Sequence, residues 1–154
     1  MKIIVHEIKD IEKIVEHLHD RFFWLDKILF SDADKTFRIP TSILSDETIL
    51  KRRLMFSKRK VDILPAELLV RNVLNYKLVD EAGIGVGDIN RIFLKDETTL
   101  CIKCGLPVYI DIHVSGISLE LNTSDQVLES VEYITYPFSV NKLNPKEFSR
   151  KQNP

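Results

Sequence analysis

Three side chains in the last third of the sequence form the best candidate for chemistry: Asp111, His113 and Glu120. Apolar and polar residues alternate on both sides of Ser115-Gly116, which predicts two strands joined by a two-residue turn. That pairing sets position 111 opposite position 120, with the carboxylates roughly 5 Å apart at Cβ. Two carboxylates and an imidazole can hold a divalent ion, as in a metal-assisted hydrolase or metal-binding protein. A solvated outer face of an antiparallel sheet shows the same pattern and is the preferred interpretation.

The two cysteines, Cys101 and Cys104, form a C-x-x-C motif followed by Gly105. A structural zinc site needs four ligands and usually a second such pair, which this sequence lacks. A redox pair needs its first thiol at the start of a helix, where the dipole lowers the thiol pKa, but the flanking pattern here is that of a strand. We therefore expect both thiols to pack as small apolar side chains, and we expect no cofactor.

The segment Gly83-Ile84-Gly85-Val86-Gly87 has the glycine content of a phosphate-binding loop. It lacks the sixth-position glycine of the dinucleotide fingerprint, and no helical pattern follows that could direct a dipole at a phosphate. The segment therefore predicts a loop between strands.

Charge is segregated along the chain, although Lys plus Arg number 22 and Asp plus Glu number 23, for a net charge of −1. Residues 104–141 contain five acids and no Lys or Arg, while residues 51–60 contain no acid. The candidate binding residues are the bases of this second segment: Lys51, Arg52, Arg53, Lys58, Arg59 and Lys60. They can meet an acidic protein, the acidic stretch of a second copy or the phosphates of a nucleic acid. A solvated charge run is the alternative interpretation.

The elements that must position these residues begin with a short strand at 2–7 and an amphipathic helix capped by Asp10. The helix is indicated by apolar residues at i, i+3, i+4 and i+7: Ile11, Ile14, Val15 and Leu18. Residues 22–30 and 36–39 predict a hairpin, and Pro40 ends its second strand or places that strand at an edge.

The middle of the chain is less regular. The spacing of apolar residues over 45–60 fits neither a helix nor a strand clearly, and Pro65 predicts a break in secondary structure. Alternation over 67–79 favours one long strand over a helix that begins near Pro65.

The later segments predict a meander of antiparallel strands with one buried face. Its strands are expected at 90–95, 99–104, 108–114 and 117–122. Residues 125–138 predict either a short helix or a last strand.

Together these elements predict an α+β fold. We expect a mainly antiparallel, hairpin-rich twisted sheet, sandwich- or half-barrel-like, with one N-terminal amphipathic helix. A chain of 154 residues suits a single domain at 1–140 and a flexible tail at 141–154. The sequence has no signal-peptide core and no apolar run long enough to span a membrane, so we expect a cytoplasmic protein with no membrane partner.

No complete catalytic set is present, so we expect a non-enzymatic interaction or assembly module. Its partner would be another protein or a second copy of this chain. The metal-assisted hydrolase or metal-binding site at residues 111, 113 and 120, and nucleic-acid binding through 51–60, are the alternatives.

Overall fold

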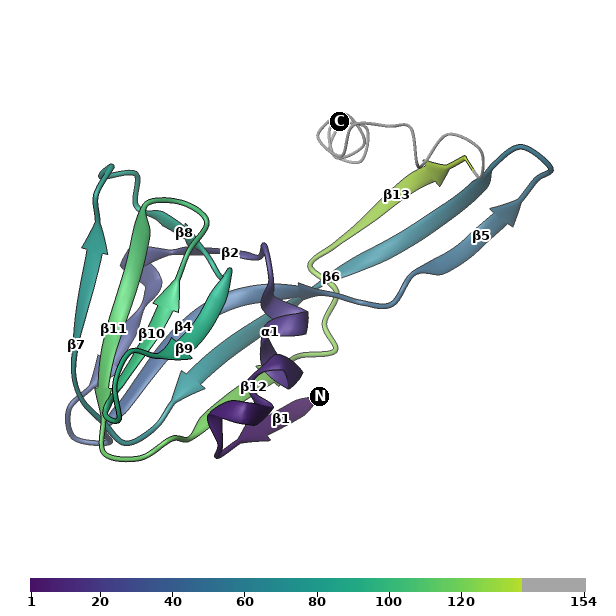
Figure 1. The fold of residues 1–154 in the computed structure, drawn as a ribbon. Coiled ribbons are helices and arrows are strands. Elements are labelled where there is room, and N and C mark those ends of the chain that lie inside the picture. The colour runs from purple at the N-terminus through teal and green to yellow at the C-terminus, as the bar shows by residue number, and fades with distance from the viewer. Residues whose placement is uncertain (137–154) are drawn as a thin grey trace. The chain divides into compact units, whose positions relative to one another are not determined.

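The computed structural model describes residues 1–136 and shows a mainly antiparallel α+β fold with one short α-helix (Figure 1). Backbone contacts divide the chain into two compact units, each described here by itself. Unit 1 comprises residues 1–43 and 65–125, and unit 2 comprises residues 44–64 and the chain from 126 onward. The tail predicted at 141–154 lies outside the described residues, and the single domain predicted for 1–140 stays a prediction.

The N-terminal helix is confirmed. α1 (Glu12–Leu18) follows strand β1 (Lys2–Val5) and a 3-10 turn, η1 (Ile8–Asp10). The predicted apolar face is buried, with its members all below a tenth exposed: Ile11, Ile14, Val15 and Leu18. Asp10 does not cap the helix, because it lies in η1, and no side chain caps α1 at Ile11.

The predicted first hairpin is present, but its first strand is interrupted. β2 (Phe22–Trp24) and β3 (Leu29–Ser31) are separated by a 3-10 turn, η2 (Leu25–Lys27). β3 pairs with β4 (Thr36–Leu44), and β4 continues through Pro40. Pro40 is tolerated because β3 pairs only with residues 36–38, so no β3 carbonyl needs an N–H from position 40.

The first sheet of unit 1 has the strand order β1-β12-β6-β4-β3. β6 (Ser57–Val70) pairs antiparallel with β12 (Leu119–Thr123), which pairs in turn with β1. Pro65 lies inside β6, so the predicted break there is wrong. Its carbonyl still accepts a hydrogen bond from the Ser124 N–H, because proline loses only the donor.

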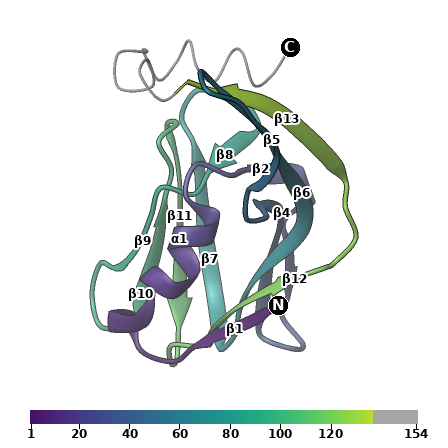
Figure 2. The same ribbon diagram turned by 90° about the vertical axis from the view of Figure 1, so that its right-hand side faces the viewer.

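The second sheet of unit 1 is four-stranded and antiparallel, in the order β7-β11-β10-β9 (Figure 2). Its strands are β7 (Val73–Asp80), β9 (Arg91–Leu94), β10 (Thr99–Lys103) and β11 (Val108–Val114). The predicted meander of β9, β10 and β11 is confirmed. The single strand predicted at 67–79 is wrong, because β6 ends at 70, β7 begins at 73, and the two belong to different sheets.

The chain passes between the two sheets of unit 1 twice, from β6 to β7 and from β11 to β12, and these two connections are hydrogen-bonded to each other. Between β6 and β7, Asn72 has a φ of 60°, a left-handed conformation that asparagine adopts more readily than most residues. Its carbonyl accepts a hydrogen bond from the Ser115 N–H, and the Ser118 carbonyl accepts one from Arg71 N–H. The predicted hairpin turn at 115–116 is therefore a crossing from one sheet to the other.

The core of unit 1 draws on both sheets. The second sheet contributes fully buried Leu100, Ile102, Ile110 and Ile112, and the first sheet contributes Phe37, Ile39, Leu68 and Leu121. Tyr76 of β7, which is 41% exposed, packs edge-on at the border of this core, with ring centroids 5.3 Å from Phe30 and 4.9 Å from Phe37. A separate two-stranded sheet pairs β2 with β8 (Val86–Asp88).

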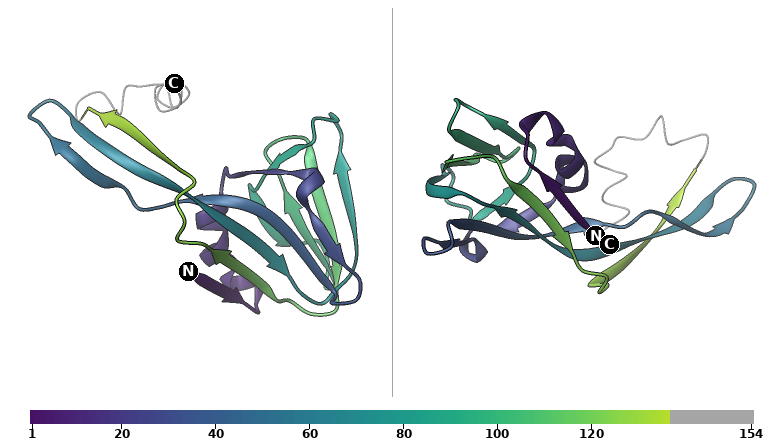
Figure 3. Two further views of the ribbon diagram at one scale, coloured as in Figure 1. Left: turned by 180° about the vertical axis from the view of Figure 1, so that it is seen from behind. Right: turned by 90° about the horizontal axis from the view of Figure 1, so that it is seen from below.

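The described part of unit 2 is an antiparallel sheet of three strands, β5 (Thr48–Arg52), the first half of β6 and β13 (Glu129–Thr135) (Figure 3). β5 and β13 each pair with this half of β6. The segments left open in the sequence, 45–60 and 125–138, therefore contain strands. Of the unit 2 residues up to 136, only Tyr133 is buried, so this described part has no core of its own.

Candidate functional site

One face of the second sheet carries two of the three predicted metal ligands, Asp111 and His113. Along β11, Val108, Ile110, Ile112 and Val114 point inward and are buried, so Tyr109, Asp111 and His113 point outward. The strand register then sets one outer row across the sheet: Phe93, Cys101, Asp111 and Lys77. The adjacent row is Arg91, Lys103, Tyr109 and Val79. We call the surface formed by these two rows, with Lys95, Thr99, His113 and Asn75, the outer face.

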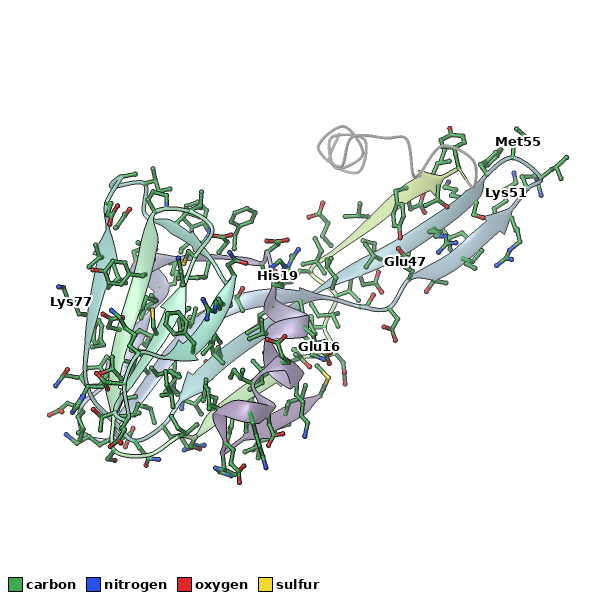
Figure 4. The ribbon with its side chains drawn as sticks, in the orientation of Figure 1. Glu16, His19, Glu47, Lys51, Met55 and Lys77 are labelled. Atoms are coloured by element: carbon green, nitrogen blue, oxygen red, sulfur yellow. The ribbon has the colours of Figure 1, made fainter. Side chains whose placement is uncertain are left out.

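Asp111 sits among cations on the outer face. Its Oδ2 lies 2.8 Å from Lys95 Nζ, and Lys77 is directly opposite on β7 (Figure 4). The hydrogen bond to Asp111 raises the pKa of Lys95. The Asp111 carboxylate is thus paired with one lysine and faces a second. A metal ion would have to displace the lysine ammonium groups, so these surroundings disfavour metal binding.

Glu120 is not part of the outer face. It lies in β12 of the first sheet, opposite Ile4 and Leu69, so the prediction that it sits beside Asp111 is wrong. Its Oε1 accepts hydrogen bonds from Arg71 at 3.3 and 3.2 Å, and Lys2 Nζ is 3.9 Å from Oε2.

The pKa of Glu120 reflects these contacts. Burial works to raise it, but hydrogen bonds from Asn122 and Arg71 outweigh burial and leave the pKa below its ordinary value. Glu120 is thus a buried anion held by its neighbours. The structure brings together two of the three predicted metal ligands, and residues 1–136 contain no group of three or more His, Cys, Asp or Glu that could hold a metal ion.

The two cysteines are buried and unbridged. Cys101 lies in β10 and Cys104 one residue beyond its end, 3% and 4% exposed. Burial, and then the neighbouring Asp111 carboxylate, raise the pKa of Cys101 to about 11. Burial likewise raises the pKa of Cys104 to about 11. Both thiols are therefore protonated at neutral pH, which suits packing, and neither is the activated thiolate that redox chemistry uses.

A pocket of about 350 Å³ opens on the outer face beside these thiols. Its walls are mostly apolar and include the rings of Phe93 and Tyr109, with Leu106, Pro107 and Val108 at one end. Lys95, Lys103 and Glu81 supply its charges. A second, more polar hollow of about 310 Å³ is lined by Asn75, Lys77, Thr99, Asp111 and His113.

Residues 83–85 of the glycine segment form a loop, whereas Val86 and Gly87 lie in β8, so the loop predicted over 83–87 is only partly correct. The amide groups of residues 83–85 already have an acceptor. The Asp80 carboxylate accepts hydrogen bonds from the N–H groups of Gly83, Ile84 and Gly85 at 3.0, 3.3 and 2.9 Å. A phosphate would need these same N–H donors. Because they already donate to Asp80, the loop has no free donors at these positions for a phosphate. Gly87, in β8, lies against the ring of Phe23 and the Cys104 thiol.

Half of the basic segment is neutralised inside unit 2. Lys58 Nζ lies 3.1 Å from Glu132, Arg59 Nη1 lies 2.7 Å from Glu47, and Lys60 Nζ lies 3.7 Å from Asp62. Because Glu132 belongs to the acidic stretch at 104–141, the two oppositely charged segments partly meet within one chain.

The other half of the basic segment forms the end of the β5–β6 hairpin. Lys51, Arg52 and Arg53 form no ion pair with any residue up to 136. They precede two exposed apolar side chains in the turn, Leu54 at 92% and Met55 at 59% (Figure 4). We call residues 51–55 the tip.

Comparison with protein-family models, curated proteins and solved structures found no match to this chain. Within the described part of the chain, no helix is long and apolar enough to cross a membrane.

Proposed function

We propose that the protein is a non-enzymatic interaction module, and that its tip docks into an apolar, acid-rimmed site on a partner protein. The observation that carries the proposal is the near-complete exposure of Leu54 beside Met55, next to three cations that form no ion pair with any residue from 1 to 136.

The apolar part of the tip supports a docking role. A single exposed leucine is ordinary, but adjacent exposed apolar residues at the end of a hairpin form a patch. Two further apolar side chains are exposed in β5, Ile49 at 43% and Leu50 at 45%. Burying such side chains in a partner stabilises a complex by roughly 25 cal/mol per Å² of apolar area removed from water, before the costs of association.

The charges favour a different protein over a second copy. A symmetric contact through two tips would bring six cations together, three from each copy, which like-charge repulsion opposes. A partner with carboxylates around an apolar centre would satisfy both components. Nucleic-acid binding through 51–60 is less well supported than the sequence suggested, since Lys58, Arg59 and Lys60 already have acidic partners.

The hydrolase alternative lacks an observation in its favour. Glu120 lies in the other sheet, and Asp111 is paired with Lys95. Catalysis is therefore not part of the proposed function.

The test is a comparison of the wild-type chain with the double variant Leu54→Ser, Met55→Ser. A protein captured by the wild type is purified, and its binding is measured by calorimetry at low and high salt. We expect a one-to-one complex that weakens with salt and at least tenfold with the double variant, because the variant removes apolar contact without touching the fold.

The matched control is Ile84→Ser, which removes an exposed apolar side chain from a loop of unit 1. Equal affinity of wild type and double variant would contradict the proposal. Retention of nucleic acid or anionic vesicles in place of a protein would also contradict it. So would light scattering that shows dimers of the wild type and only monomers of the double variant.

A further inference from the structure

We propose that the outer-face pocket between Phe93 and Tyr109 binds a nucleotide unit, with the base against the aromatic rings and the phosphate at Lys103. This site lies wholly in unit 1 and does not depend on the function proposed for the tip. A free nucleotide and a nucleotide within a single strand offer the same base and phosphate, and the experiment below distinguishes these two sources.

The walls of the pocket suit a flat aromatic group. Phe93 on β9 and Tyr109 on β11 both line it, on either side of β10. The guanidinium of Arg91 lies 4.5 Å from the centroid of Phe93, so a planar cation already stacks on that ring. Aromatic side chains on an open antiparallel sheet are a general platform for bases, because every base has a π-face.

The volume and the thiols also fit this ligand class. A pocket of about 350 Å³ lies within the range of small-molecule and cofactor sites. Cys101 and Cys104 line it as neutral thiols, so they add apolar surface and no negative charge that would repel a phosphate.

The charges orient the ligand. Lys103 is exposed and has no ion pair among the described residues, so its ammonium is available to a phosphate. Lys95 lines the same pocket, and its Nζ lies 5.4 Å from the centroid of the Tyr109 ring. Its ion pair with Asp111 partly neutralises its charge. Glu81 would repel a phosphate but can accept a hydrogen bond from a base, from the exocyclic amino group of adenine or the ring N3–H of uracil or thymine. We therefore place the phosphate toward the lysines and the base edge toward Glu81.

The experiment uses the whole chain and three kinds of probe: AMP and UMP, a ten-nucleotide oligo(dT) or oligo(rU), and a ten-base-pair DNA duplex. Binding is followed by calorimetry and by fluorescence anisotropy of labelled strands. We expect saturable binding of mononucleotides, single strands or both, and weaker binding of the duplex, whose bases are already stacked. A strand that binds far more tightly than a mononucleotide identifies single-stranded nucleic acid as the source.

The variants separate this pocket from other surfaces. Phe93→Leu should weaken binding about 5- to 150-fold, the range for loss of one base–aromatic stack, and Phe93→Tyr should retain it. Lys103→Gln should weaken binding and lower the salt slope for a strand by about 0.7. Trp24→Leu is the control for an exposed aromatic on β2, and Arg52→Gln is the control for a cation at the tip.

Thermal unfolding of each variant shows whether it folds. Should Phe93→Leu fail to fold, Lys103→Gln and Phe93→Tyr still decide the question, since the first changes an exposed side chain and the second keeps the ring. The proposal is overturned by absence of saturable binding to every probe. It is also overturned by equal effects of Phe93→Leu and Trp24→Leu, or by loss of binding with Arg52→Gln and not with Lys103→Gln.

Discussion

At the scale of single residues, two carboxylates that the sequence placed together have different surroundings. Asp111 is on the outer face and pairs with one exposed lysine. Glu120 is 6% exposed and is held by Arg71, Asn122 and Lys2. Burial of a charge is tolerated only when such contacts compensate for lost hydration, so Glu120 acts as a structural anion.

The structural role of Glu120 predicts a pH-dependent loss of stability in Glu120→Gln. The variant keeps the shape but loses the charge-assisted hydrogen bonds with Arg71, and we expect about 1–3 kcal/mol less free energy of unfolding near neutral pH. Because folding lowers the pKa of Glu120, its contribution is complete above the ordinary value of 4.5 and is lost as the pH falls through the folded-state pKa.

Urea unfolding of wild type and variant over a pH series measures this effect. The stability difference should shrink below about pH 4.5. Glu97→Gln, at an exposed turn, is the control and should change little at any pH. A wild-type-to-variant difference that stays constant down to the acid limit would show that the charge of Glu120 is not what stabilises the fold.

The candidate pocket illustrates what single residues in a sequence do and do not disclose. Alternation of apolar and polar residues along β11 indicates that Tyr109, Asp111 and His113 lie on the same face of this strand. Phe93 and Lys103 were not singled out, although they lie at outward positions of the neighbouring strands. Counting alternate positions in β9 and β10 would have placed them on the same face, but only if the meander register were already known.

At the scale of elements, local patterns identified strands well and their partners poorly. The helix face, the β3–β4 hairpin and the β9–β10–β11 meander follow from nearest-neighbour periodicity and turn residues, and they are confirmed. The failures are at 71–72 and 115–118, where the chain crosses between sheets. A crossing and a hairpin turn use similar small polar residues, so the sequence alone does not distinguish them.

Pairing of β2 with β8 depends on a missing side chain at Gly87. A Cβ there would lie 2.6 Å from Cζ of the buried Phe23 and 3.1 Å from Cys104 Sγ. We therefore expect Gly87→Ala to lower the free energy of unfolding by about 1–3 kcal/mol through overpacking. Chemical denaturation provides the measurement.

Gly116→Ala is the matched control for this prediction. The nearest atom to its added Cβ is Asn72 Nδ2 at 3.6 Å, an ordinary contact. Equal stability of the two alanine variants would mean that β2 and β8 shift to accommodate the methyl group, and that the close approach is not required.

At the scale of the whole molecule, the segregated charge of the sequence has two outcomes. Part of it is satisfied internally, where Lys58, Arg59 and Lys60 meet acids of unit 2. The remaining cations, at the tip, have no acidic partner within the described part of the chain. Self-association through the oppositely charged segments is therefore less well supported than contact with a different protein. The basic segment at 51–60 already has three of its six cations in ion pairs within one chain.

The most direct test of the docking claim is site-specific photo-crosslinking in cells. A photoreactive amino acid at Met55 should form a covalent adduct with one acidic partner protein, whereas the same group at Glu97, an exposed turn of unit 1, should not. Adding Leu54→Ser should abolish the adduct while the thermal midpoint of unfolding stays the same, because Leu54 is 92% exposed. Identical adducts from positions 55 and 97, or adducts only with a second copy of this chain or with nucleic acid, would contradict the account.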